Sequence, residues 1–182
     1  LGDVYKRQKD DNLKKIIDKS GNEYLTKSKD PFITLFNSIL GQQISVSAAT
    51  SIKKKITSKV KITAKEIDRI SEENLKNCGV SRMKISYLKD LSSKIINKEI
   101  SFKDLYKLDD NEVIKYLTSV KGIGDWTAEM FMIFHLGRPN ILPIKDIGII
   151  NSLVKMYGED KKNINFERTN QLGFLQTTRS KL

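Results

Sequence analysis

The sequence predicts an all-α fold, and two observations support this prediction. Apolar residues recur with helical periodicity along most of the chain, whereas the alternating pattern that is typical of strands is nearly absent. The chain has 182 residues, of which 38% are hydrophobic. That length allows one domain, or two small lobes around a shared cleft, with enough apolar side chains for a core.

Most of the expected helices begin at a residue that can cap a helix N-terminus. Asp30 followed by Pro31 starts a helix that Gly41 ends, and Ser45 starts the next helix. Ser81 starts a longer helix. Its apolar positions recur at a spacing of four and are Met83, Tyr87, Leu91 and Ile95.

The second half of the chain continues this row of helices. Asp109 and Glu112 have the spacing of a capping box, which starts another helix. The glycine-containing turn 121–124 follows, and it leads into an apolar helix over about 125–136. Residues 138–140 interrupt the helical pattern, and the last clear helix is expected over about 146–157.

The charge of the chain narrows the range of partners. Its 33 Lys and Arg residues against 22 Asp and Glu residues give a net charge of +11. A polyanionic partner such as DNA or RNA would explain this excess. The alternative is a lysine-rich composition that only solvates the surface, so the charge alone does not decide.

Composition also excludes several classes of protein. The single cysteine, Cys78, rules out an internal disulfide and any zinc or iron–sulfur site with four cysteine ligands. No apolar run approaches the ~18 residues that would cross a bilayer, and no segment is laid out like a signal peptide. We expect a soluble, cytoplasmic protein that does not contact membranes.

The two ends of the chain depart from the helical pattern. Residues 1–8 (LGDVYKRQ) resemble a translated adapter, and we expect them to be non-native or disordered. Residues 9–164 are expected to form the functional domain. Residues 165–182 are expected to be an atypical, truncated tail.

The most informative segment is Lys121-Gly122-Ile123-Gly124, between two expected helices. Glycines permit positive φ angles and let the backbone approach another surface closely. The N–H groups at the start of the following helix can bind phosphate oxygens without reading base sequence. An ordinary turn with a glycine C-cap is the alternative. The flanking helices, the small Ala128 and the basic composition favour phosphate binding.

About twenty residues later, Asp146 lies in the first turn of the last clear helix. By itself it would be a helix cap. A phosphate-binding hairpin followed by an aspartate at the next helix start is more specific. It resembles the helix-hairpin-helix/Gly-Pro-Asp arrangement of the endonuclease III superfamily of DNA glycosylases. The segments that look like the 3-methyladenine DNA glycosylase II group within that superfamily are 36–45, 78–84, 120–128, 136–139 and 143–148.

This resemblance implies a fold and an activity. The implied fold is two-lobed and helical, with the active site in a cleft between the lobes. The implied activity is hydrolysis of the N-glycosidic bond of alkylated purines in base excision repair. A monomer would act on double-stranded DNA with damaged bases and would need no cofactor. Trp126 stands where bifunctional relatives have a lysine, which implies a monofunctional enzyme with water as nucleophile.

The matching motifs also imply the site residues. Asp146 is the expected catalytic residue, because its carboxylate would stabilise positive charge on the sugar or orient the water. Trp126 and Met130 are expected to line the base pocket. Gln43, or else Ile44, is expected to fill the gap that the extruded base leaves. The expected DNA contacts are Gln42, Gln43, Ile44, Gly122, Ile123, Gly124 and Thr127. The expected ligands of a structural Na⁺ or K⁺ ion are the main-chain carbonyls of Thr118, Val120 and Ile123.

Three alternatives remain open at this point. The chain could be a glycosylase for an oxidised or mismatched base. It could be a non-catalytic helix-hairpin-helix DNA-binding module, which would tolerate any residue at position 146. It could also be a truncated product that folds poorly, since residues 165–182 lack the Trp, Tyr and Pro of the family's closing helix. The one histidine, His135, is expected to be structural.

Overall fold

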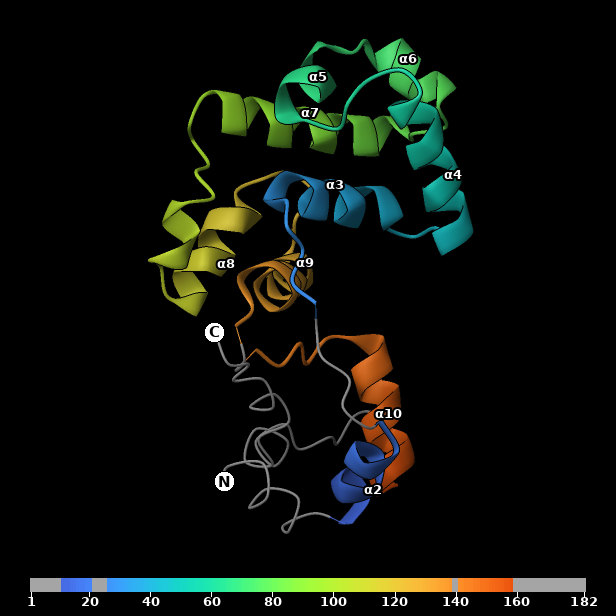
Figure 1. The fold of residues 1–182 in the computed structure, drawn as a ribbon, viewed down its shortest axis with the longest axis vertical. Coiled ribbons are helices and arrows are strands. Elements are labelled where there is room, and N and C mark those ends of the chain that lie inside the picture. The colour runs from blue at the N-terminus through green and yellow to red at the C-terminus, as the bar shows by residue number, and fades with distance from the viewer. Residues whose placement is uncertain (1–10, 21–25, 139–140, 159–182) are drawn as a thin grey trace. The chain divides into compact units, whose positions relative to one another are not determined.

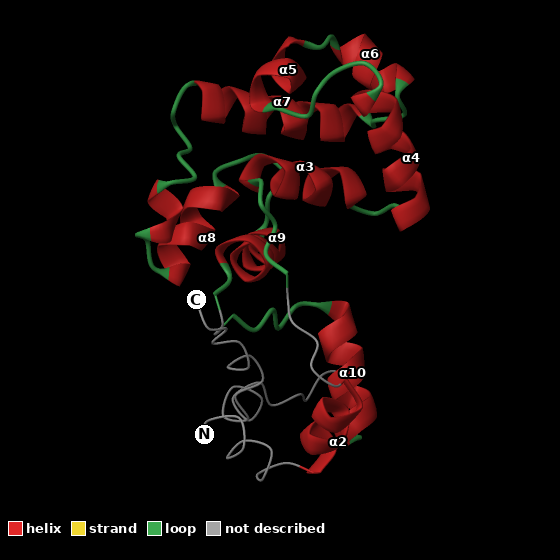
Figure 2. Cartoon of the chain, in the orientation of Figure 1, coloured by secondary structure: helices red, strands yellow, loops and turns green. Residues whose placement is uncertain are grey.

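The computed structural model describes residues 11–20, 26–138 and 141–158. Residues 1–8 and 165–182 lie outside the described residues, so the expectations for both ends stay predictions. Over the described residues the chain forms helices and no strand (Figure 2), which confirms the all-α class. None of these helices is long and apolar enough to cross a membrane.

The chain divides into two compact units (Figure 1). The larger unit covers residues 28–136, and the smaller combines residues 1–27 with residues 137–182. The larger unit contains α3 (Pro31–Gly41), α4 (Val46–Thr57), α5 (Ala64–Arg69), α6 (Glu72–Asn77), α7 (Arg82–Ile96), the 3₁₀ turn η1 (Asp104–Tyr106), α8 (Asp110–Thr118), α9 (Asp125–Phe131) and the π-helical turn η2 (Met132–Leu136). The described part of the smaller unit contains α2 (Asp11–Ser20) and α10 (Ile147–Tyr157). The expected single domain over 9–164 and the expected cleft between lobes stay predictions.

Helix α3 is central to the larger unit, where it contacts α4, α7 and α9 (Figure 1). Its side chains Leu35, Phe36 and Ile39 are fully buried. Burying an apolar side chain of this size stabilises a fold by roughly 1.5–3 kcal/mol relative to leaving it exposed. The helix is therefore held by its neighbours along its whole length, and its C-terminal end has a defined position.

The capping residues that the sequence predicts are confirmed. Asp30 Oδ1 accepts a hydrogen bond from the Ile33 N–H at 2.9 Å, and Pro31 occupies the first helical position. Ser45 and Ser81 cap α4 and α7 in the same way. Asp109 forms a complete capping box with the third residue of α8. These bonds satisfy N–H groups that a helix start otherwise leaves without a partner.

The apolar positions expected on α7 coincide only in part with its buried face. Met83 is 56% exposed, whereas Leu91, which belongs to the same spacing of four, is buried. The buried side chains of this helix are Lys84, Ile85, Leu88, Leu91 and Ser92. The helix packs against α3, α5 and α6, and this packing selects a face that includes a lysine and a serine. The short helices α5 and α6 were not predicted.

In the smaller unit, α2 and α10 are joined by a side-chain hydrogen bond. The Asn12 Nδ2 group donates to the main-chain carbonyl of Met156, with a donor–acceptor distance of 3.2 Å. Leu153 on α10 is buried. Helix α10, which begins directly after Asp146, is therefore packed within the smaller unit.

Candidate nucleic-acid interface and catalytic carboxylate

The hairpin 121–124 joins α8 to α9 in the larger unit. The Ile123 N–H donates to the Val120 carbonyl at 3.1 Å and closes the turn. The Lys121 N–H donates to Asp90 Oδ2 at 2.9 Å. Among the described residues, the N–H groups of Gly122 and Gly124 have no hydrogen-bond partner. Two backbone donors are therefore available to an anion such as a phosphate.

The two glycines of the hairpin are needed for different reasons. Gly122 has a φ of +78°, and a Cβ atom there would collide with the ring of Tyr87. Gly124 has a φ of −97° and is the N-cap of α9, so the expected positive φ holds for the first glycine alone. A Cβ atom at Gly124 would meet nothing within 4 Å. Gly122 therefore lets the hairpin pack against the Tyr87 ring, and Gly124 leaves the backbone beside it accessible.

The turn between α3 and α4 comes next to the hairpin. The Gln42 Nε2 group donates to the Gly122 carbonyl at 2.8 Å, across 80 residues of sequence. Gln43 is exposed and has a φ of +55°, in the left-handed region that residues other than glycine rarely adopt. Ile44 is 37% exposed. The structure thus brings the expected DNA contacts of the turn and of the hairpin together.

Helix α9 presents the expected pocket residues Trp126 and Met130 to different degrees. Trp126 is 41% exposed in the first turn of the helix, and Met130 is partly buried. Thr127 and Ile123 are buried, so they can reach DNA only through their main-chain groups. The roles of all four residues stay predictions.

The main-chain carbonyls of Thr118, Val120 and Ile123 are the expected ligands of a monovalent cation. The Val120 carbonyl already accepts the hydrogen bond that closes the hairpin. A carbonyl oxygen has two lone pairs, so this bond leaves one for a cation. Oxygen donors of this kind suit a hard cation, and the cation site stays a prediction.

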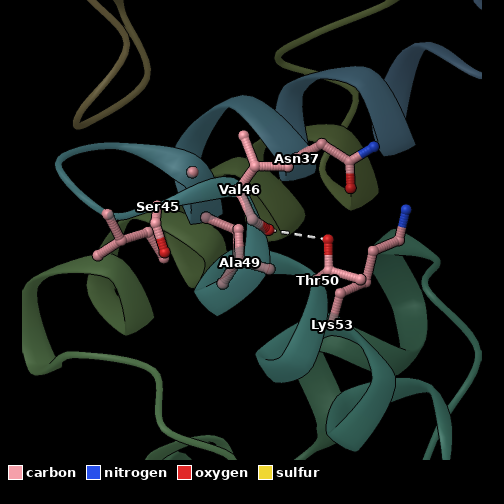
Figure 3. A pocket seen from close by; sticks show the side chains of 9 residues that line it. Asn37, Ser45, Val46, Ala49, Thr50 and Lys53 are labelled. Atoms are coloured by element: carbon pink, nitrogen blue, oxygen red, sulfur yellow. Dashed lines mark hydrogen bonds between the residues drawn. The ribbon is translucent and has the colours of Figure 1, made fainter.

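A pocket of about 320 Å³ opens between α3 and α4, beside the turn (Figure 3). Its walls are mostly apolar, and polar groups come from Asn37, Ser45, Thr50 and Lys53. Neither Trp126 nor Met130 lines it. This pocket is therefore distinct from the base pocket that the sequence predicts.

The smaller unit carries the expected catalytic carboxylate at the start of α10. Asp146 is the N-cap of this helix, and its Oδ1 atom accepts a hydrogen bond from the Ile149 N–H at 3.0 Å. A Cβ atom at Gly148 would lie 3.0 Å from the same Oδ1 atom. The cap bond therefore positions the carboxylate, and glycine at position 148 leaves the space that this position needs.

Three polar residues of the larger unit have contacts that sequence reasoning missed. Lys84 is buried, and its Nζ atom donates to the Leu40 carbonyl at 2.8 Å. Desolvation by burial lowers the pKa of this lysine from its usual value. Asp90 and Tyr87 contact the hairpin. No local pattern identifies them, because their partners are 31 to 44 residues away.

The single histidine lies in the core of the larger unit. His135 is buried in the π-helical turn, with its ring centroid 4.8 Å from that of Phe131. Its Nε2 atom is 3.5 Å from the Tyr106 hydroxyl. This packing supports the structural role expected for it.

The chain matches the family model for the HhH-GPD superfamily base excision DNA repair proteins over residues 36–173. It is 34% identical to DNA-3-methyladenine glycosylase 1 of Schizosaccharomyces pombe over 150 residues, which are 78% of this chain and 66% of that protein. It is 37% identical to the DNA-3-methyladenine glycosylase of Saccharomyces cerevisiae over 153 residues, which are 76% of this chain and 50% of that protein. The chain thus spans between half and two thirds of the length of these two relatives.

The chain is also similar to a solved structure. The 3-methyladenine DNA glycosylase of Schizosaccharomyces pombe in complex with abasic DNA superposes with a TM-score of 0.78 at 28% sequence identity. The match covers 95% of this chain and 93% of that one.

Proposed function

Because the chain belongs to the HhH-GPD superfamily of base excision DNA repair proteins, we propose that it is a DNA glycosylase for alkylated purines of the 3-methyladenine type. It hydrolyses the N-glycosidic bond, acts as a monomer on double-stranded DNA that contains damaged bases, and works in the cytoplasm. One observation contributes most to this proposal. A hairpin with two N–H groups that have no partner among the described residues is followed along the chain by an aspartate that caps a helix.

The hairpin and the turn bind the DNA. The N–H groups of Gly122 and Gly124 bind phosphate oxygens, and a cation held by the carbonyls of the hairpin would add positive charge there. A relative of known structure was solved in complex with abasic DNA, which supports duplex DNA as the partner. The net charge of +11 favours the same partner.

The carboxylate of Asp146 supplies the chemistry. The bond between sugar and base lengthens, and positive charge develops on the deoxyribose ring. A carboxylate opposite this charge stabilises the transition state more than the ground state. An alkylated purine that already carries a positive charge is a good leaving group, so no strong acid is needed. Water then attacks the sugar carbon, and Asp146 orients it or accepts its proton.

The exposed ring of Trp126 supports the choice of an electron-poor base. A cationic base stacked on an indole ring gains about 1–2 kcal/mol when water is excluded. An uncharged, oxidised base would gain less from the same contact. The names of two relatives, both 3-methyladenine glycosylases, favour the same substrate class. The direct test is release of 3-methyladenine from duplex DNA treated with a simple methylating agent.

We expect base release without strand cleavage. A lyase step needs an amine that forms a Schiff base with the opened sugar, and the indole of Trp126 cannot form one. Reaction with methylated duplex should leave an abasic site that breaks only after alkali is added. Borohydride reduction during the reaction should trap no covalent protein–DNA adduct. A trapped adduct would contradict the monofunctional mechanism, and Lys121 would then be the first candidate for the amine.

We also expect that the backbone strain at Gln43 can be separated from the function of its side chain. Gln43→Gly removes the left-handed strain and should leave stability equal or up to ~1 kcal/mol higher. Gln43→Ala keeps the strain. Both variants should lose about tenfold or more in base release, because no side chain then offsets an unstacking cost of a few kcal/mol. Thermal melts and single-turnover assays check this. Full activity in Gln43→Gly would show that Gln43 does not fill the gap.

A non-catalytic helix-hairpin-helix module is the second candidate. The exposed hairpin donors would serve such a module equally well. Asp146 favours the enzyme, since a module needs no carboxylate at that position. Binding to duplex DNA with no release of any base from methylated, oxidised or mismatched duplexes would establish the module instead.

A further inference from the structure

One face of α7 contacts both candidate DNA-binding loops. Lys84, Tyr87 and Asp90 follow one another at a spacing of three, so they lie within about a third of the helix circumference. Lys84 contacts the C-terminal end of α3, directly before the turn 42–44. Tyr87 and Asp90 contact the hairpin 121–124. A single helix therefore supports two loops that are about 80 residues apart in sequence.

The contact of Lys84 fixes the point at which the chain enters the turn. Its buried Nζ atom donates to the carbonyl of Leu40, in the last turn of α3, at 2.8 Å. Carbonyls in the last turn of a helix lack intrahelical partners and form the negative end of the helix dipole, which attracts a cation. This bond lies two residues before Gln42 and three before Gln43.

The backbone of the turn contributes little to its own position. The Gln42 N–H and the Ile39 carbonyl are 3.4 Å apart, as are the Ile44 N–H and the Gly41 carbonyl. Both distances are long for a hydrogen bond and indicate weak ones. The two shorter bonds at the turn come from side chains and measure 2.8 Å each, one from Lys84 and one from Gln42 to the hairpin. Side chains therefore decide where the left-handed Gln43 lies.

The hairpin is held from the same helix by complementary contacts. Asp90 accepts the Lys121 N–H at 2.9 Å, and the Tyr87 ring lies against the Cα atom of Gly122. Gln42 then joins the carbonyl of Gly122 to the turn. The chain of contacts thus runs from α7 to the hairpin, from the hairpin to the turn, and from the turn through α3 back to α7.

We propose that α7 makes the turn and the hairpin one rigid unit, and that Lys84 is a positioning residue that holds the turn where Gln43 can enter the duplex. The proposal rests on the proposed function, since it assigns a role in base extrusion to residues that touch neither the base nor the sugar. The proposal distinguishes binding of the DNA backbone from insertion of the turn into the duplex. Phosphate binding by the hairpin does not depend on Lys84, whereas insertion of the turn into the duplex does.

The same helix offers a matched control. Lys89 is also partly buried on α7, and its Nζ atom donates to the carbonyls of Asp68 and Ile70 at the end of α5. Its contacts involve neither the turn nor the hairpin. Lys84→Met and Lys89→Met each remove an ammonium group that binds carbonyls at a helix end and keep a side chain of similar length. Only the first removes the support of the turn.

The test uses a duplex with a tetrahydrofuran abasic analogue and 2-aminopurine as its neighbour, whose fluorescence rises when the turn unstacks it. We expect Lys84→Met to bind undamaged duplex within about twofold of the parent, yet to lose most of the fluorescence rise and at least tenfold in the single-turnover rate on methylated DNA. Lys84→Arg, which keeps a cationic donor, should recover part of both. Lys89→Met should melt at a lower temperature and keep both the fluorescence rise and the rate.

Two outcomes would overturn the proposal. One is a parent-like fluorescence rise in Lys84→Met, and the other is an equal loss in both lysine variants. If Lys84→Met does not fold, Gln42→Leu provides the test, because it removes the bond to the Gly122 carbonyl from a partly exposed position. A parent-like rise in that variant would count equally against the proposal. If the parent releases no base from methylated DNA, the proposed function fails, whatever the fluorescence shows.

Discussion

Replacing Asp146 by asparagine is expected to lower the rate of base release by ~10²–10⁴-fold, the loss typical of removing an electrostatic or acid–base group. The variant loses the negative charge that opposes positive charge on the sugar. Asparagine is nearly isosteric and accepts the same cap bond from the Ile149 N–H, so the helix should begin as before. The thermal melting temperature should change little. Affinity for damaged duplex should be equal or higher, because a carboxylate near phosphates is repulsive.

A second helix cap in the chain is the matched control. Asp30 caps α3 with an Oδ1 acceptor distance of 2.9 Å, against 3.0 Å for Asp146 at α10. Asp30→Asn makes the same change in charge and in cap chemistry, and it should leave base release at the parent rate. Single-turnover excision and equilibrium binding on one lesion duplex compare the two variants. If Asp146→Asn excises the base at nearly the parent rate, Asp146 caps the helix and has no catalytic role.

Replacing Gly122 by alanine is expected to produce the largest loss of folding stability among the hairpin variants. A residue other than glycine at a φ of +78° is strained by about 1–2 kcal/mol. The added methyl group also collides with the Tyr87 ring, and overpacking of this kind typically costs about 1–3 kcal/mol. The free energy of unfolding should fall by roughly 2–5 kcal/mol, and DNA affinity should fall as the hairpin shifts.

Replacing the second hairpin glycine by alanine should leave folding stability unchanged and still weaken DNA binding. Gly124→Ala meets no atom within 4 Å and has an ordinary φ, so its unfolding free energy should stay within about 0.5 kcal/mol of the parent. Its methyl group lies on the outer side of the hairpin and should weaken binding to duplex DNA of any sequence. Chemical denaturation and binding at fixed salt separate the two variants. If a stable Gly124→Ala variant binds DNA as the parent does, the hairpin does not contact DNA.

The Gln42 side chain shows why a residue type at a motif position does not fix its role. The sequence places Gln42 and Gln43 side by side as expected DNA contacts. In the structure, the side chain of Gln42 binds the Gly122 carbonyl, whereas Gln43 is exposed in a left-handed conformation. Gln42 therefore joins the two loops, while a contact with the duplex stays a prediction for Gln43.

The sequence by itself determined most of the longer helices and their starting points, whereas the short helices α5 and α6 were not predicted. The caps at Asp30, Ser45, Ser81, Asp109 and Asp146 could be predicted because each bond joins residues three apart. The hairpin could be predicted from its glycines for the same reason. Such bonds depend on the local backbone and hold in any fold that keeps the helix.

Only the tertiary structure decided which faces are buried and which loops meet. Met83 belongs to the apolar spacing of α7 and is exposed, while Lys84 is buried against a carbonyl 44 residues away. Burial depends on which helix packs against which, and a charged side chain is buried only where a distant partner satisfies it. The link between Gln42 and the hairpin spans 80 residues and has no trace in local periodicity. The support of the two candidate DNA-binding loops by α7 is therefore a property of the packed fold.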